Sequence, residues 1–187
     1  MVEEIIREFE ALPEVEAIAL GGSRVGNNYD EKSDFDVYIY VKSPISEKIR
    51  TDILSKYCER MENGNHFWEY EDNFTLNNGI DIDVLYRNLD DFLVGITEVV
   101  EQYQAHNGYT TCMWHNLRTC KVIFDKEQRL EAAKIRFDIE YPKQLKTNII
   151  NHNMKLVRTA PFYRCNGDIR RMSEHGLSAD EETLHPR

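Results

Sequence analysis

The sequence has no excess of positive charge. It contains 23 lysine and arginine residues against 33 aspartate and glutamate residues, which gives a formal net charge of −10 at pH 7. Proteins that bind nucleic acid non-specifically neutralise phosphates with lysine and arginine side chains. We therefore expect no broad nucleic-acid surface, and a large RNA or DNA partner is an unfavourable interpretation.

Long apolar runs and paired cysteine motifs are also missing. There is no run of about 18 apolar residues that would cross a membrane, and the N-terminus is acidic where a signal peptide would be basic. The cysteines Cys58, Cys112, Cys120 and Cys165 show no Cys-x-x-Cys spacing, which predicts reduced and mostly buried thiols. These absences predict a cytoplasmic protein without membrane contact.

The most informative feature that is present is a glycine turn after a strand-like segment. The apolar run Val15–Leu20 leads directly into Gly21 and Gly22. Because glycine has no side chain, the backbone can turn sharply here and a ligand can approach the backbone amides. Gly22 and the Ser23 hydroxyl are therefore candidates for binding phosphate groups, while Arg24 is equally suited to binding phosphate and to pairing with a nearby acid.

Two carboxylates open the next strand-like segment. Asp34 and Asp36 flank Phe35, and the alternation from Phe35 to Val41 is typical of a strand. Residues i and i+2 of a strand share a face, so both acids point the same way. Neighbouring carboxylates repel each other unless a cation lies between them. The expected cation is Mg²⁺, which binds carboxylate and phosphate oxygens at about 2.0–2.1 Å.

A further strand, predicted over residues 79–86, carries Asp81 and Asp83 on one face. Acidic residues have low strand propensity, so local folding does not explain them. A metal site built jointly with Asp34 and Asp36 does explain them. On spacing alone, either Asp81 or Asp83 is able to supply the third carboxylate.

Three short motifs together resemble the signature of the polymerase-β-type nucleotidyltransferase superfamily: Gly22-Ser23, Asp34-x-Asp36 and an apolar-Asp-apolar strand at Asp83. Further segments are similar to a bacterial branch of small nucleotidyltransferases related to aminoglycoside and lincosamide adenylyltransferases: Trp68–Asp72, Ile82–Arg87 and Trp114–Leu117. The resemblance covers roughly residues 1–165. It favours Asp83 over Asp81 as the third acid.

The resemblance implies a Mg²⁺-dependent transferase that moves a nucleoside monophosphate, most often AMP from ATP, onto a hydroxyl of a small molecule and releases pyrophosphate. It implies two Mg²⁺ ions held by Asp34, Asp36 and Asp83 when the nucleotide is bound, one orienting the triphosphate and one activating the acceptor hydroxyl. Two alternatives stay open: AMP transfer to a protein side chain, as an antitoxin acting on a partner toxin would perform, and a non-catalytic nucleotide-binding module.

Three further residues are candidates for contact with the acceptor. Glu69 and Glu71 lie on one face of a strand predicted over residues 67–76 and are able to supply a general base, although a solvated strand face explains them as well. His115, beside Trp114, is suited equally to contacting the nucleotide or acceptor and to packing.

The predicted fold is α/β (α+β), with a small mixed β-sheet flanked by helices and a short helical C-terminal part. We divide the chain into a nucleotidyltransferase domain (1–106), a helical extension that resembles a truncated C-terminal domain (107–164) and a polar tail expected to be poorly ordered (165–187). A site completed in a homodimer would suit so short a chain. The hydrophobic spacing predicts helices over 2–12, 45–62, 89–103, 112–117, 127–140 and 142–158, and further strands over 15–20 and 121–125. Ser43 and Pro44 are the expected start of the second helix.

Overall fold

The computed structural model describes residues 1–26, 33–66 and 69–159. The elements in chain order are α1 (Val2–Glu10), β1 (Val15–Gly21), the 3₁₀ turn η1 (Ser23–Val25), β2 (Phe35–Val41), α2 (Glu47–Leu54), β3 (Cys58–Asn65), β4 (Glu71–Leu76), β5 (Asp81–Asn88), α3 (Leu89–Val100), α4 (Cys112–Thr119), β6 (Lys121–Asp125), α5 (Arg129–Phe137) and α6 (Lys143–Thr159). The predicted tail over residues 165–187 lies outside the described residues.

The strands form one six-stranded sheet in the order β3-β4-β5-β2-β1-β6. Strands β2 and β5 are parallel, whereas the other neighbouring pairs are antiparallel. The predicted mixed sheet is therefore confirmed. Strands β2 and β5 run in the same direction at the centre of the sheet. The acidic residues near their N-terminal ends therefore lie side by side at the same end of the sheet.

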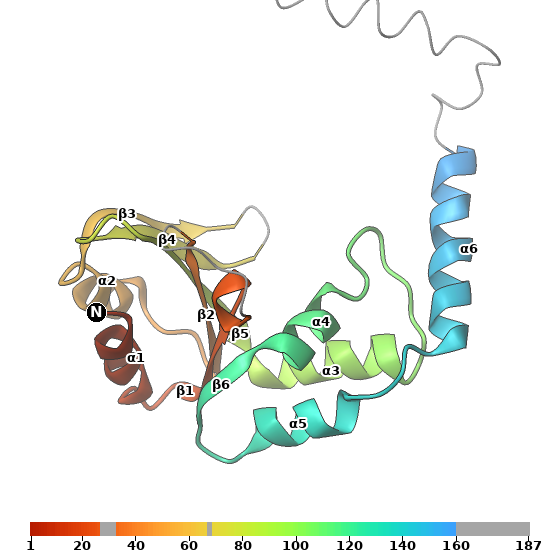
Figure 1. The fold of residues 1–187 in the computed structure, drawn as a ribbon, viewed down its shortest axis with the longest axis horizontal. Coiled ribbons are helices and arrows are strands. Elements are labelled where there is room, and N and C mark those ends of the chain that lie inside the picture. The colour runs from red at the N-terminus through yellow and green to blue at the C-terminus, as the bar shows by residue number, and fades with distance from the viewer. Residues whose placement is uncertain (27–32, 67–68, 160–187) are drawn as a thin grey trace, which may run out of the picture.

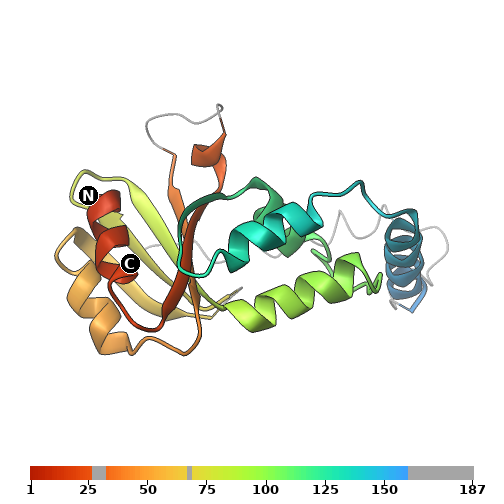
Figure 2. The ribbon, with the colours of Figure 1, turned by 90° about the horizontal axis from the view of Figure 1, so that it is seen from below.

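Helices cover both faces of this sheet (Figures 1 and 2). On one face, α1 and α2 enclose a core that includes Phe9, Ile18 and Ile82. On the other face, α3, α4 and α5 enclose a second core that includes Tyr40 and Trp114. The alternation of side chains along each strand divides the apolar residues between the two cores.

The last helix, α6, projects away from the rest of the fold (Figure 1). Its first turns are anchored by Leu145, which is fully buried, and by the Asn148 side chain, which donates a hydrogen bond to the Tyr103 carbonyl at 2.8 Å. Across the part of the chain that the structure describes, none of the helices has the length and apolar character needed to cross a membrane.

The helix predicted over residues 45–62 is wrong at both ends. Its N-cap is Ser46, whose hydroxyl accepts a hydrogen bond from the Ile49 amide, so Ser43 and Pro44 precede the helix. The helix ends at Leu54, and the residues from Cys58 onward form the edge strand β3. The hydrogen bonds of β3 to β4 satisfy backbone groups that helix propensity alone would have placed in a helix.

The same shift changes which side of α2 is buried. The helical spacing of Ile45, Ile49, Ile53 and Tyr57 predicts that these side chains form the buried face. The Ile49 side chain is instead 36% exposed, whereas the neighbouring Arg50 is only 1% exposed. The buried face of α2 consists of Arg50, Ile53 and Leu54. A buried arginine needs a partner of opposite charge. For Arg50 this partner is Asp72 of strand β4.

Candidate active site

The central parallel pair places two of the predicted acids side by side. Asp36 of β2 pairs in register with Asp83 of β5, and the flanking pairs are Phe35 with Ile82 and Val37 with Val84. Residues in register on adjacent strands point to the same face of the sheet. Asp36 and Asp83 are both half-buried, while Asp34, which precedes β2, is exposed.

Asp34 and Asp83 are close enough to Asp36 to affect its ionisation. The pKa of Asp36 is raised to about 6, first by burial and then by the negative charges of Asp34 and Asp83. Arg87 opposes this increase, and Glu71 adds to it. The site therefore concentrates negative charge around one half-buried carboxyl group, which is the electrostatic pattern that a bound cation would relieve.

The register also distinguishes Asp81 from Asp83. Asp81 lies two residues before Asp83 on β5, about 7 Å farther along the strand, and it is exposed. Its carboxylate accepts a hydrogen bond from the Thr75 hydroxyl at 2.7 Å. Asp83 accepts one from the Asn73 amide at 2.7 Å and lies directly beside Asp36. This arrangement favours Asp83 as the third member of the site.

The glycine turn approaches the acids from the adjacent strand. At the end of β1, Gly21 pairs with Asp36, and Gly22 follows with a φ of 65°. A Cβ atom added to Gly22 would collide with Oδ2 of Asp36. Only glycine allows both this left-handed backbone and this close approach. The turn then continues into η1, which begins at Ser23, so the Gly22–Ser23 backbone lies directly against the acidic site.

Arg24 makes contacts within the connection between η1 and β2. Its Nε donates to the carbonyls of Ser33 and Asp34 at 2.7 and 3.1 Å, and its guanidinium group lies 4.0 Å from the centroid of the Phe35 ring. These contacts link η1, at the start of the connection, to the residues that immediately precede and begin β2. They position Asp34 at the entrance to β2.

Strand β4 extends the polar face beside β5. Glu71 pairs with Leu85, and Asn73 pairs with Asp83. The pKa of Glu71 is raised, mainly by burial, and the charges of Asp83 and Glu69 act in the same direction, while a hydrogen bond from Asn73 opposes them. A carboxylate with a raised pKa next to the acidic cluster has the properties of a general base.

The structure separates the two predicted glutamates by their contacts. Glu69 forms a two-pronged ion pair with Arg87, with Oε2 at 2.7 Å from Nε and Oε1 at 2.8 Å from Nη2. The Arg87 side chain is almost fully buried and lies against the ring of Tyr38. Glu69 is thus occupied by a fixed partner, whereas Glu71 lies closer to the acids.

His115 lies in a different part of the molecule. It is an exposed residue of α4 and lines a hollow of about 600 Å³ between α4 and α5, together with Arg118, Lys134 and Asp138. None of the predicted acids lines this hollow. Another hollow, of about 300 Å³, is lined by Asp34, Asp81 and Asp83.

The donor set fits a magnesium site that substrate completes. In the described residues, no group of three or more His, Cys, Asp or Glu side chains is placed to hold a metal ion without further ligands. Mg²⁺ does not need one, because it usually takes one or two carboxylates together with phosphate oxygens and water. The half-buried carboxylates of Asp36 and Asp83, beside the bare turn at Gly22, supply that kind of open oxygen site.

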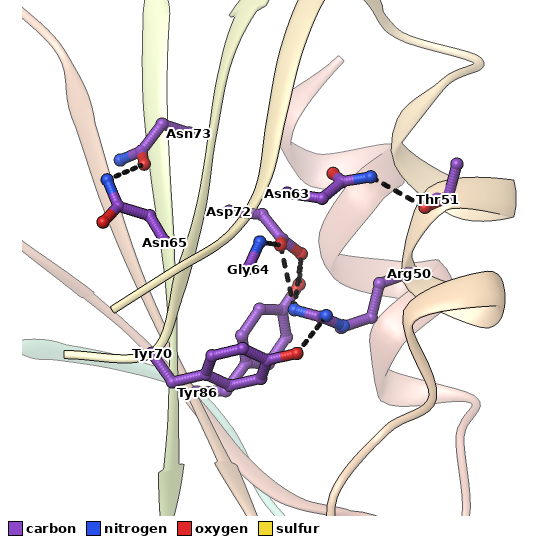
Figure 3. A network of polar contacts seen from close by, with 9 residues as sticks. All are labelled: Arg50, Thr51, Asn63, Gly64, Asn65, Tyr70, Asp72, Asn73 and Tyr86. Atoms are coloured by element: carbon purple, nitrogen blue, oxygen red, sulfur yellow. Dashed lines mark hydrogen bonds and ion pairs between the residues drawn. The ribbon is translucent and has the colours of Figure 1, made fainter. Parts of the chain in front are cut away.

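Sequence reasoning missed a buried polar network on the opposite face of the sheet (Figure 3). Both carboxylate oxygens of Asp72 lie 2.9 Å from Nη1 of Arg50, and the two side chains are 0% and 1% exposed. The Tyr86 hydroxyl and the Gly64 amide also donate to Asp72, each at 2.9 Å, and Arg50 donates to the Tyr70 hydroxyl. The one signal in the sequence is an acid at a strand position whose neighbours on the same face, at i+2 and i+4, are apolar.

Residues 3–78 match the family model described as Polymerase beta, Nucleotidyltransferase. The matched segment contains the glycine turn, Asp34 and Asp36, and it ends before Asp83. The match supports nucleotidyl transfer and agrees with the predicted superfamily; it does not reach the antibiotic adenylyltransferase branch.

Among solved structures, a similar chain comes from the crystal structure of a mutant of the toxin-antitoxin MntA-HpeT. It has 11% sequence identity and a TM-score of 0.34, and the similarity covers 95% of this chain and 96% of that chain. These values are too low to support a conclusion about function. No curated protein sequence matches the chain.

Proposed function

We propose that the protein is a Mg²⁺-dependent nucleotidyltransferase that moves a nucleoside monophosphate, AMP from ATP, onto a hydroxyl group of a small molecule and releases pyrophosphate. The observation that carries this proposal is the register of Asp36 with Asp83, directly beside the side-chain-free turn at Gly22. The family match over residues 3–78 supports the same chemistry.

In this proposal, the Gly22–Ser23 turn binds the β- and γ-phosphates through backbone amides and the Ser23 hydroxyl. Oriented amides of this kind bind phosphate without adding a charged side chain. Asp34, Asp36 and Asp83 would hold two Mg²⁺ ions, which when bound would neutralise charge on the phosphates and lower the pKa of the attacking hydroxyl. Arg24 fixes the connection from which Asp34 projects.

Glu71 is the proposed base for the acceptor. The acceptor oxygen forms a bond to the α-phosphorus, the bond from that phosphorus to the pyrophosphate oxygen breaks, and the acceptor proton passes to the Glu71 carboxylate. Burial and the neighbouring acids already raise the pKa of Glu71, so its affinity for a proton exceeds that of an ordinary glutamate. The ion pair with Arg87 leaves Glu69 less suited to this role.

Calorimetric titration with ATP and with a non-hydrolysable analogue, with and without Mg²⁺, tests the proposal. We expect Mg²⁺-dependent binding by the wild type that weakens at least about tenfold, or ~1.4 kcal/mol, in Asp36→Asn and in Asp83→Asn. Asp81→Asn is the matched control, because it removes an acid from the same strand face two residues away. It should bind as the wild type does.

Wild-type protein that binds no nucleotide in the presence of Mg²⁺ would contradict the proposed function. A loss of binding in Asp81→Asn but not in Asp83→Asn would instead move the third carboxylate to Asp81. Pyrophosphate release in a screen of hydroxyl-bearing acceptors then measures turnover, and labelling of protein in place of small molecules would redirect the proposal to AMP transfer onto a side chain.

A further inference from the structure

A hollow of about 530 Å³ lies between α3, α4 and the residues that connect them. This volume is within the range of small-molecule sites. Its buried and half-buried apolar side chains are Phe92, Ile96, Val99, Met113 and Trp114, and polar residues that include His106, Asn107 and Thr110 complete the lining. Most of these apolar residues also belong to the second core, so the walls are held in place by the packing of the fold.

The hollow adjoins the acidic site along the same face of the sheet. Arg87, which lines the hollow, follows Asp83 by four positions on β5, a distance of about 13 Å along the strand. Leu85 lies between them on that face, and Glu71 of β4 is in register with it. A molecule bound in the hollow would therefore reach the acids by passing Glu71.

Two acidic residues and one arginine line the hollow, so negative charge predominates there. Among the described residues, Arg87 is the only arginine that lines it, and Glu69 already binds two of its nitrogens. Within this ion pair the Glu69 side chain is 22% exposed and the Arg87 side chain is 6% exposed. The carboxylate of Glu69 is therefore the more accessible member of the pair for a molecule in the hollow. Asp91, exposed in the first turn of α3, adds a second negative charge at the edge.

We propose that this hollow holds the acceptor, and that the acceptor is an alcohol with an apolar ring body and a cationic amino group. The assignment rests on the proposed nucleotidyl transfer. The apolar walls would bind the ring body, the carboxylates of Glu69 and Asp91 would attract the amine, and the hydroxyl would extend past Glu71. Phosphorylated acceptors would be repelled, and a highly hydroxylated polycation lacks the apolar surface that these walls would bury.

Two probes of the same shape and opposite charge test the chemistry of the hollow: 1-adamantylmethylamine and 1-adamantanecarboxylate. In calorimetric titrations of the full chain we expect the amine to bind at least about tenfold more tightly than the carboxylate. Asp91→Asn should reduce this preference at least about threefold, because one of the two attracting charges is removed.

Gly95→Leu provides a variant that fills the hollow. Gly95 lines the hollow on α3, and a Cβ atom added there meets no atom within 4 Å. Leucine is also a better helix former than glycine, so the variant should fold. We expect it to bind the amine at least about tenfold more weakly and ATP with Mg²⁺ as tightly as the wild type. Val94→Leu, at a neighbouring exposed position that does not line the hollow, is the control.

Equal binding of the two probes, or amine binding that Gly95→Leu leaves unchanged, would overturn the proposal. So would a loss of ATP binding in Gly95→Leu, because the hollow would then hold the nucleoside and not the acceptor. Failure of the proposed function is distinguishable, since it appears as absent Mg²⁺-dependent ATP binding in the wild type and would remove the acceptor role whatever the probes show.

Discussion

Replacing Asp36 with asparagine should stabilise the protein at neutral pH in the absence of divalent metal. The pKa of this carboxyl group is raised from 3.8 to about 6, first by burial and then by repulsion from Asp34 and Asp83. The folded state therefore binds the Asp36 proton more tightly than the unfolded chain does. Ionisation of Asp36 destabilises the fold, and the loss develops as the pH rises from about 4 to about 6.

The magnitude follows from the same shift. The full change in pKa corresponds to an upper bound of about 3 kcal/mol. Because Asp36 is only partly buried, screening by solvent reduces this to about 1–2 kcal/mol. Urea denaturation at pH 7.5 with EDTA should show Asp36→Asn more stable than the wild type by this amount, and at pH 3.5 the difference should fall below about 0.5 kcal/mol.

A matched control is Asp52→Asn. Asp52 is exposed and pairs with Lys48 at 2.8 Å on the surface of α2. Its replacement should change the free energy of unfolding by less than about 1 kcal/mol at either pH. If Asp36→Asn were instead less stable than the wild type at pH 7.5 in EDTA, the ionised Asp36 side chain would stabilise the fold. The argument that its ionisation costs free energy, which a bound cation would offset, would then fail.

Two further predictions concern stability elsewhere in the fold. Gly22→Ala should lower the free energy of unfolding by about 2–4 kcal/mol in urea denaturation, which is more than Gly79→Ala should lower it. Both glycines have positive φ, but only Gly22 lies against Asp36. Equal losses would show that backbone strain alone, without the collision with Asp36, causes the loss of stability. Arg50→Met should cost about 3–5 kcal/mol by leaving Asp72 charged and unpaired in the core, and the double variant Arg50→Met/Asp72→Leu should recover most of it. A double variant as unstable as the single one would refute the charge argument.

The strand-turn-strand unit could be predicted from the sequence because its signals are local. The alternation from Phe35 to Val41 and the glycines at the end of β1 act over a few residues, and the structure confirms both strands. The pairing of Asp36 with Asp83 was not predictable from spacing, because β3 and β4 lie between β2 and β5 in the chain and a parallel neighbour requires a crossover.

Residues 58–65 show why local signals fail. Glutamate, arginine and methionine between Tyr57 and Asn63 favour a helix, in agreement with the apolar spacing that predicts a helix reaching residue 62. The structure instead pairs Cys58 with Leu76 and Met61 with Phe74 in an edge strand. The stabilising partner is contributed by a segment farther along the chain, so the 3.6-residue spacing of nearby apolar residues carries no information about it.

The two adjacent glycines illustrate how one dipeptide can serve both packing and chemistry. A Cβ atom at Gly21 would collide with the ring and hydroxyl of Tyr38, just as one at Gly22 would collide with Asp36. Tyr38 and Asp36 are neighbours on one face of β2, and both side chains lie over the end of β1. The two glycines leave room for them there, because they have no side chains. Tyr38 in turn contacts Arg87, which holds Glu69 at the apolar hollow. The position of the acidic cluster and the shape of the neighbouring hollow therefore both depend on the two glycines, Gly21 and Gly22. A substitution at either glycine would disturb both.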